Sequence, residues 1–179
     1  LILVAKNYWS GMPFWFRKKP VGARSESLVL RAQDLRQFRA VSWDMAEKPK
    51  VGVVLMHPRV DFTHHYAIPR LLEAGFSVLG AMTRGAGSDV YVEHEEMLLD
   101  MAGAIRFLKE RRGVEKVVLL GNSGGGALAA YYQAEARRLP QIRTKTSPAG
   151  RPTHFEDATM TPADLMVYVA AHRGQGQVM

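Results

Sequence analysis

Residues 117–126, VVLLGNSGGG, join four apolar residues to the pattern Gly-x-Ser-x-Gly and a further glycine. The apolar run is typical of a buried strand, and the following ALAAYY (127–132) has the apolar periodicity of a helix. A serine between such a strand and helix is the sequence form of a nucleophile elbow, a strained turn that exposes the hydroxyl. The stretch therefore predicts a nucleophilic Ser123 at the carboxyl end of a strand.

The glycines around Ser123 fit this geometry. Gly121 and Gly125 have no side chain at the positions where the strand and the helix nearly touch, so we assign them to the shaping of the elbow. The amide of Gly124 lies at the start of the helix, where it can donate a hydrogen bond to a developing oxyanion.

Two other interpretations of these residues remain open. A glycine-rich turn between a strand and a helix would leave Ser123 as an ordinary solvated side chain. Gly124-x-Gly126-x-x-Ala129 also fits the permissive form of a dinucleotide-binding fingerprint. That fingerprint follows an early strand and precedes an acidic residue by about 20 positions. Here several strands come first, and the region near Arg143 is basic.

The remaining sequence predicts an alternation of strands and helices. Six segments have strand character: 27–33, 38–45, 51–56, 77–82, 116–121 and 164–170. A short polar connection makes the first two a hairpin. Helical periodicity covers 64–74, 94–112 and 124–138, and glycines at 75 and 113 end the first two helices. This order predicts a mostly parallel, doubly wound α/β sheet with helices on both faces, followed by an irregular excursion at 139–162.

The order of elements resembles the N-terminal two-thirds of an α/β-hydrolase, with an antiparallel hairpin, strand–helix units and a serine elbow after the fifth strand. The resemblance covers roughly residues 27–179 and implies an α/β-hydrolase core that lacks its last strands, preceded by an N-terminal extension at 1–26. It includes residues 56–59, MHPR, where this family places the second oxyanion-hole amide. The family often has His-Gly there, whereas this chain has His-Pro.

The resemblance implies a serine esterase or hydrolase. Ser123 would attack a carboxylic ester or related acyl substrate and form an acyl-enzyme. The amides of Gly124 and of Arg59 (or Val60) would bind the oxyanion, and His57 is expected to line the pocket. The alternatives are a non-catalytic binding domain of the same fold, or a lyase or perhydrolase that uses the same serine.

The catalytic acid and base do not follow from the sequence. In this family an acid and then a histidine come after the serine and after later strands. Beyond Ser123 the chain offers His154, His172, Asp157 and Asp164, whose positions do not match that order. Asp164 opens the sixth strand at the end away from the serine, while His172 follows that strand and is expected to line the pocket. We therefore expect the acid and base to lie outside these 179 residues, in a C-terminal remainder of the same protein.

The composition of the chain limits the kinds of ligand and partner that it is expected to bind. The chain is 47% hydrophobic and 23% charged, as in ordinary globular domains, and has a net charge of +7. It has no cysteine, and its six histidines show no metal-site spacing, so we expect no metal and no cofactor. The lack of cysteine also fits a reducing, cytoplasmic location. Short basic runs without interleaved aromatics argue against a nucleic-acid partner, and the resemblance implies a small-molecule acyl substrate instead.

The N-terminal residues leave one question open. LILVA (1–5) is far shorter than a membrane span and lacks the charged front of a secretory signal, so we expect no stable membrane span. The role of the aromatic residues at 8–16 does not follow from the sequence.

Overall fold

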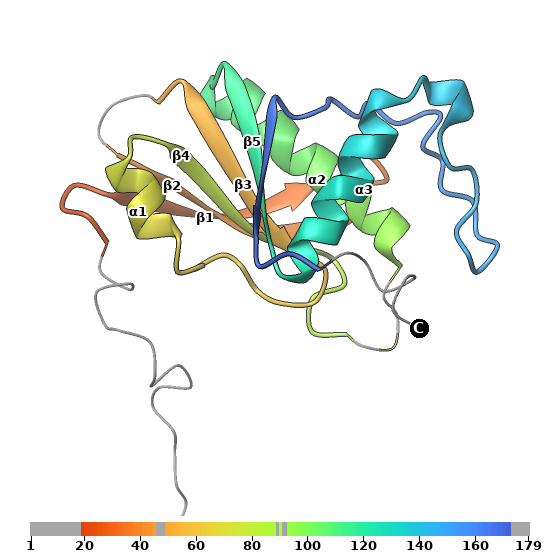
Figure 1. Ribbon diagram of the computed structural model, residues 1–179, viewed down its shortest axis with the longest axis horizontal. Helices are drawn as coiled ribbons and strands as arrows, with labels where there is room; N and C mark the ends of the chain where they lie inside the picture. Colours follow the sequence, from red (N-terminus) through yellow and green to blue (C-terminus); the bar gives the residue numbers. More distant parts are fainter. Residues whose placement is uncertain (1–18, 46–48, 89, 91–92, 173–179) are drawn as a thin grey trace, which may run out of the picture.

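A six-stranded sheet runs through the centre of the structure (Figure 1). The structure is a computed structural model that describes residues 19–45, 49–88, 90 and 93–172. The strands are β1 (Arg24–Arg31), β2 (Gln37–Asp44), β3 (Val51–His57), β4 (Ser77–Met82), β5 (Lys116–Asn122) and β6 (Leu165–Val169), in the spatial order β1-β2-β4-β3-β5-β6. The first two form an antiparallel hairpin, β2 pairs antiparallel with β4, and β4, β3, β5 and β6 are mutually parallel. The predicted fold class is therefore confirmed for the described residues.

Helices cover both faces of the sheet (Figure 1). They are α1 (Ile68–Glu73), α2 (His94–Phe107) and α3 (Gly124–Arg137), with a π-helical turn η2 (Leu108–Arg112) and a 3-10 turn η3 (Pro140–Ile142). Alternate residues of β3 face opposite sides: Val54 and Met56 pack with α2 and α3, while Val53 and Leu55 pack with α1. This two-sided burial explains why the parallel strands are almost continuously apolar.

The first predicted helix is wrong at its start. The sequence predicts a helix over 64–74, but α1 begins only at Ile68, with Pro69 in its first turn. The preceding residues form turns instead, and the amide of Ala67 donates to the Nδ1 atom of His65 at 3.2 Å. A histidine side chain thus binds a backbone group that a longer helix would have used. The second helix has the predicted extent, but its last turn is π-helical and ends at Gly113, whose φ is +69°.

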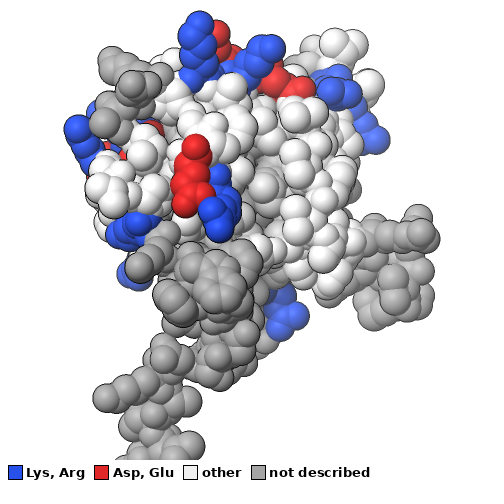
Figure 2. All heavy atoms as spheres, turned by 60° about the vertical axis from the view of Figure 1, so that its left-hand side comes forward, with Lys and Arg blue, Asp and Glu red and all other residues white. Residues whose placement is uncertain are grey.

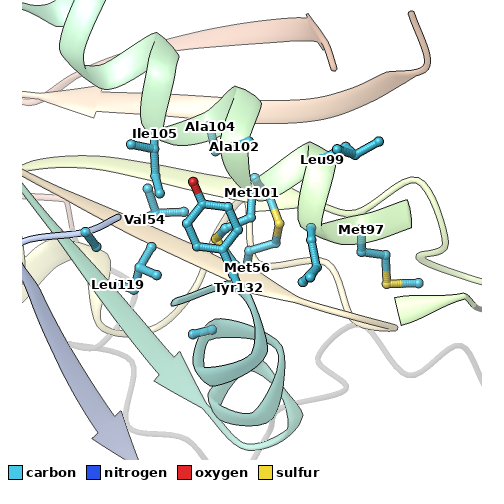
Figure 3. Packing of buried hydrophobic residues seen from close by; sticks show 14 of the residues in the cluster. Val54, Met56, Met97, Leu99, Met101, Ala102, Ala104, Ile105, Leu119 and Tyr132 are labelled. Atoms are coloured by element: carbon cyan, nitrogen blue, oxygen red, sulfur yellow. The ribbon is translucent and has the colours of Figure 1, made fainter. Parts of the chain in front are cut away.

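The larger core cluster lies between the sheet and helices α2 and α3 (Figure 3). Methionine, isoleucine and leucine side chains of these elements surround Tyr132, whose ring is completely buried. The hydroxyl of Tyr132 donates to the carbonyl of Thr161 at 2.8 Å, which satisfies the polar end of the ring. This bond also joins the excursion at 139–162 to α3.

The excursion is irregular, as predicted, but it is held in place by a buried cation. Arg143 is only 7% exposed. Its Nε donates to the carbonyl of Glu135 at 3.0 Å, and its Nη1 donates to the carbonyls of Phe155 at 2.9 Å and Ala158 at 2.7 Å. A basic residue that looks like part of a solvated loop in the sequence is therefore an anchor between α3 and the excursion.

The surface and the N-terminal segment bear on the expected partners. In the part of the chain that the structure describes, no helix has the length and apolar character needed to cross a membrane. On the face drawn in Figure 2, Lys and Arg side chains are scattered, and several of them lie beside acidic ones. The aromatic segment at 8–16 lies outside the described residues. The first strand, β1, begins three residues before the start predicted for it.

Candidate active site

Ser123 occupies a strained turn between β5 and α3. Its φ is +53° and its ψ is −128°, a combination that non-glycine residues rarely adopt and that costs of order 1–3 kcal/mol. β5 ends at Asn122 and α3 begins at Gly124, so the serine is the single residue between strand and helix. An ordinary solvated turn has no need of such a backbone, whereas a nucleophile elbow is built on one.

The glycines of the elbow allow three backbone segments to meet. A Cβ atom added to Gly121 would lie 2.5 Å from the Cα of Gly126, and one added to Gly125 would lie 2.4 Å from the carbonyl oxygen of Met56. Neither backbone can move away without displacing a strand or a helix. The elbow-shaping role that the sequence assigns to Gly121 and Gly125 thus has a direct steric basis.

The end of β6 holds the elbow from the other side. The amide of Ser123 donates to the carbonyl of Val169 at 3.2 Å, and the amide of His172 donates to the carbonyl of Ser123 at 3.0 Å. This backbone bond brings the side chain of His172 close to the serine. Its Nε2 atom lies 3.4 Å from the Oγ of Ser123. His172 therefore sits at the hydroxyl itself and does not line the adjoining cavity. Among the described residues, no carboxylate is hydrogen-bonded to His172.

The other candidate acids and bases lie elsewhere. A carboxylate oxygen of Asp164 accepts the amide of Val117 at 2.8 Å, at the start of β5 and thus at the opposite end of the strand from Ser123. His154 and Asp157 lie in the excursion with Glu156, and one ligand atom from each is within 4.8 Å of the others. All three side chains are exposed, and exposed groups of this kind are common without an ion. None of these residues contacts the serine.

A cavity of about 620 Å³ opens beside Ser123. Its wall is mainly apolar and aromatic, with Trp43, Phe62, Tyr66, Ile68 and Leu72, and its polar part includes His57, His65 and Asn122 next to the serine. The ammonium of Lys19 also lines it, 4.3 Å from the centre of the Trp43 ring. Such a space accommodates an apolar group attached to a reacting polar centre.

The side chain of His57 binds the loop that follows β3 by two hydrogen bonds. Its Nδ1 atom accepts hydrogen bonds from the amides of Arg59 and Val60, both at 3.0 Å. The resemblance places these amides in the oxyanion hole, but in this structure they donate to the imidazole. The His-Pro dipeptide thus gives a loop that turns back on its own histidine, which is the physical reason why the second predicted amide donor does not face the serine here.

The same contacts fix the protonation of His57. A ring nitrogen that accepts two amides carries no proton, so the proton of the neutral ring is on Nε2. Burial is the largest cause of a lowered pKa of His57, and repulsion from His172 and Arg59 adds to it. Together they lower this pKa to about 4. The ring is therefore neutral at pH 7.

This lowered pKa predicts a loss of stability on acidification. In the unfolded chain the ring has its ordinary pKa of 6.5, so between pH 6.5 and about 4 the unfolded state binds a proton that the folded state does not. The full stabilisation is present above pH 6.5 and falls by about 3 kcal/mol as the pH drops to 4. Urea unfolding of wild type and His57→Asn across this range measures it. The variant should show a shallower decline, exposed His154→Asn should not, and an unchanged slope in His57→Asn would contradict the assignment.

Asn122 and His65 form a second link that the sequence did not reveal. Nδ1 of His65 accepts the amide of Ala67, so its Nε2–H donates to Oδ1 of Asn122 at 3.2 Å. The Nδ2 of Asn122 in turn donates to the carbonyl of Val169 at 2.8 Å. The side chain before the serine therefore ties the loop after β3 to the end of β6. Its only sequence signal is a polar residue at the end of an otherwise apolar strand.

Comparisons with known proteins agree with this architecture. No protein-family model matches the sequence. A bacterial brefeldin A esterase, described as a homologue of human hormone-sensitive lipase, superposes with a TM-score of 0.51 at 19% identity, over 64% of this chain and 35% of its own. An esterase from Pyrococcus furiosus superposes with a TM-score of 0.51 at 18% identity, over 64% of this chain and 47% of its own.

One curated relative is detected by sequence. Bifunctional epoxide hydrolase 2 of Sus scrofa is 30% identical over 113 residues, which are 59% of this chain and 20% of that protein. The chain thus spans one fifth of the porcine protein and less than half of each esterase. At these identities the structural matches establish the fold.

Proposed function

Given that the chain has the α/β-hydrolase fold, we propose that it is the core of a serine hydrolase that cleaves a carboxylic ester or related acyl substrate. The observation that carries the proposal is the strained backbone of Ser123, with its hydroxyl beside an apolar cavity and 3.4 Å from an imidazole nitrogen. A strained residue at a cavity is a feature of sites that pre-organise a reacting group.

The proposed reaction proceeds through an acyl-enzyme. The Oγ of Ser123 bonds to the acyl carbon while its proton passes to a base, and the alcohol leaves with that proton. Water then attacks the acyl-serine, gives its proton to the base, and releases the carboxylic acid with the serine restored. The amide of Gly124 is the first donor to the oxyanion, since the first amides of a helix have no acceptor within it.

The base is proposed to be His172, in place of one outside the chain. Its Nε2 is within loose hydrogen-bond reach of the serine, a spacing common before substrate binds. The acid that orients it is proposed to come from residues outside the described part. A base supplied from outside these 179 residues is the alternative that the experiment below distinguishes.

The chemistry of serine favours acyl compounds over epoxides. The name of the porcine relative includes the hydrolysis of epoxides. Attack of a serine oxygen on an epoxide carbon gives an ether, which water does not cleave under ordinary conditions, so Ser123 would be consumed after one turnover. Attack on an ester gives an acyl-serine that water does cleave. The aromatic wall of the cavity further favours an apolar acyl group.

Labelling by a fluorophosphonate tests the proposal. This probe reacts with activated serines, so we expect one adduct per chain on the peptide that contains Ser123, located by mass spectrometry. Ser123→Ala and heat-unfolded protein should not react, while Ser27→Ala, at an exposed serine of β1, should react as wild type. A folded wild-type chain that is not labelled at Ser123 would overturn the proposed function.

The same assay tests the base. His172→Ala should slow labelling by roughly 100-fold or more, because general-base assistance contributes about that much. His154→Ala, at an exposed histidine of the excursion, is the matched control and should label at the wild-type rate. If His172→Ala also labels at the wild-type rate, the base is not His172.

A further inference from the structure

We propose that His57 is a catalytic residue whose Nε2–H donates the second hydrogen bond to the oxyanion, opposite the amide of Gly124. This inference rests on the proposed function and adds a side-chain donor at the place where the resemblance predicts a backbone amide. In this proposal the loop amides of Arg59 and Val60 do not bind the oxyanion. The imidazole to which they donate binds it instead.

The hydrogen bonds to His57 determine which of its ring nitrogens carries the proton. Because Nδ1 accepts the amides of Arg59 and Val60 at 3.0 Å each, it has no room for a proton. The neutral ring therefore always presents Nε2 as a donor. For the same reason His57 is not the base, since a base must present an unprotonated Nε2 to the serine. Two backbone amides thus convert a histidine beside the nucleophile into a fixed hydrogen-bond donor.

The ring lies against the elbow. A Cβ atom added to Gly124 would be 2.9 Å from the Nε2 of His57, so the donor nitrogen sits over the residue whose amide is the first oxyanion donor. His57 and Ser123 line the same cavity. Nε2 makes no hydrogen bond with any residue that the structure describes, although His57 is only 9% exposed. This donor belongs to the cavity that the reacting serine also lines, and it is available for a ligand atom.

The electrostatics support this role. Burial and the neighbouring His172 and Arg59 lower the pKa of His57 to about 4. The ring therefore stays neutral when His172, which is exposed and next to the hydroxyl, takes the serine proton. A donor that is already in place and needs no rearrangement when charge develops is the kind of group that stabilises an oxyanion.

Two substitutions separate this role from a structural one. His57→Asn keeps an oxygen at the position of Nδ1, which accepts the loop amides, but it loses the donor in the cavity. His57→Gln extends an amide N–H to the position of Nε2 but loses the acceptor for the loop. If His57 donates to the oxyanion, His57→Asn is the damaged variant, and if it only holds the loop, His57→Gln is.

We expect His57→Asn to lower kcat for p-nitrophenyl butyrate, and the rate of fluorophosphonate labelling, by 100- to 1,000-fold, with KM changed less than about threefold. His57→Gln should retain at least a tenth of the wild-type rates. Equal rates for His57→Asn and wild type, or a greater loss in His57→Gln, would overturn the inference. An unlabelled wild-type chain would overturn the proposed function and this inference with it.

A second measurement does not depend on turnover. Nitrogen-15 NMR of the histidine rings reports which nitrogen carries the proton, and for His57 we expect it on Nε2. Addition of phenylboronic acid, which forms a tetrahedral adduct with an activated serine, should move that proton downfield in wild type and not in Ser123→Ala. A proton on Nδ1, or a resonance that the boronic acid leaves unchanged while fluorophosphonate still labels Ser123, would overturn the role of His57 alone.

Discussion

Replacing Ser123 with alanine is expected to lower kcat for ester hydrolysis by at least about 10⁴-fold, the scale seen when a nucleophilic serine is removed from a triad. The reason is that no other described residue offers a hydroxyl at the elbow between β5 and α3. Initial rates with p-nitrophenyl butyrate measure the loss, and Ser27→Ala is the control. Hydrolysis that survives at more than a hundredth of the wild-type rate would show that Ser123 is not the nucleophile.

Stability distinguishes the chemistry of Ser123 from its strain. Alanine keeps the Cβ atom, so Ser123→Ala retains the unfavourable backbone at φ +53° and should unfold at nearly the wild-type urea concentration. Glycine adopts that backbone readily, so Ser123→Gly should gain of order 1 kcal/mol in the free energy of unfolding while being equally inactive. The greater freedom of glycine in the unfolded chain opposes part of this gain. Equal stabilities of the two variants would contradict the strain.

The largest loss of stability is expected from Arg84→Met. Asp100 is completely buried in α2, and Nε and Nη2 of Arg84 donate to its Oδ1 at 2.9 and 2.7 Å. Arg84 also binds Asp34 in the β1–β2 turn. Burial raises the pKa of Asp100, and the charge of Asp34 adds to this, whereas the contacts with Arg84 lower it, so the carboxylate depends on this cation to stay ionised. Removing one partner of a buried pair leaves an uncompensated charge, at about 3–5 kcal/mol.

An exposed ion pair provides the control for Arg84. Arg70 and Glu73 pair at 2.6 Å on the solvent side of α1, and Arg70→Met should cost no more than about 1 kcal/mol. The double variant Arg84→Met/Asp100→Asn should recover part of the loss, because the neutral amide needs no counterion. Urea unfolding at pH 7 measures all three. If Arg84→Met and Arg70→Met cost the same, the network around Asp100 is not a buried ion pair in solution.

The elements of the sheet were predictable because their signals are local. Apolar runs bounded by turn residues mark the strands, and the alternation with helices determines that β3 to β6 are parallel. The turn that places Ser123 between β5 and α3 was predictable for the same reason, since its strand, serine and glycines are contiguous in the chain. The start of α1 was not, because a tertiary environment lets His65 bind the amide of Ala67.

The rest of the candidate site depends on contacts between distant segments. The link from His65 through Asn122 to Val169 joins the loop after β3 to the last residues of β5 and β6. The proposed role of His57 depends on how the loop after β3 turns, and the sequence predicted the loop but not the direction of its amides. The proximity of His172 to Ser123 results from the register of β6 on β5, which pairs Asn122 with Val169.

That register has a dynamic consequence. β6 is one of the two edge strands of the described sheet, and its residues Leu165 and Tyr168 are more than half exposed. Edge segments with little buried surface open more often than the centre of a sheet. Both backbone groups of Ser123 are bonded to residues at or beyond the end of β6, so each opening of this strand would let the serine relax out of its strained conformation. The strained geometry of Ser123 would then be lost by opening of β6 at temperatures below the unfolding of the whole molecule.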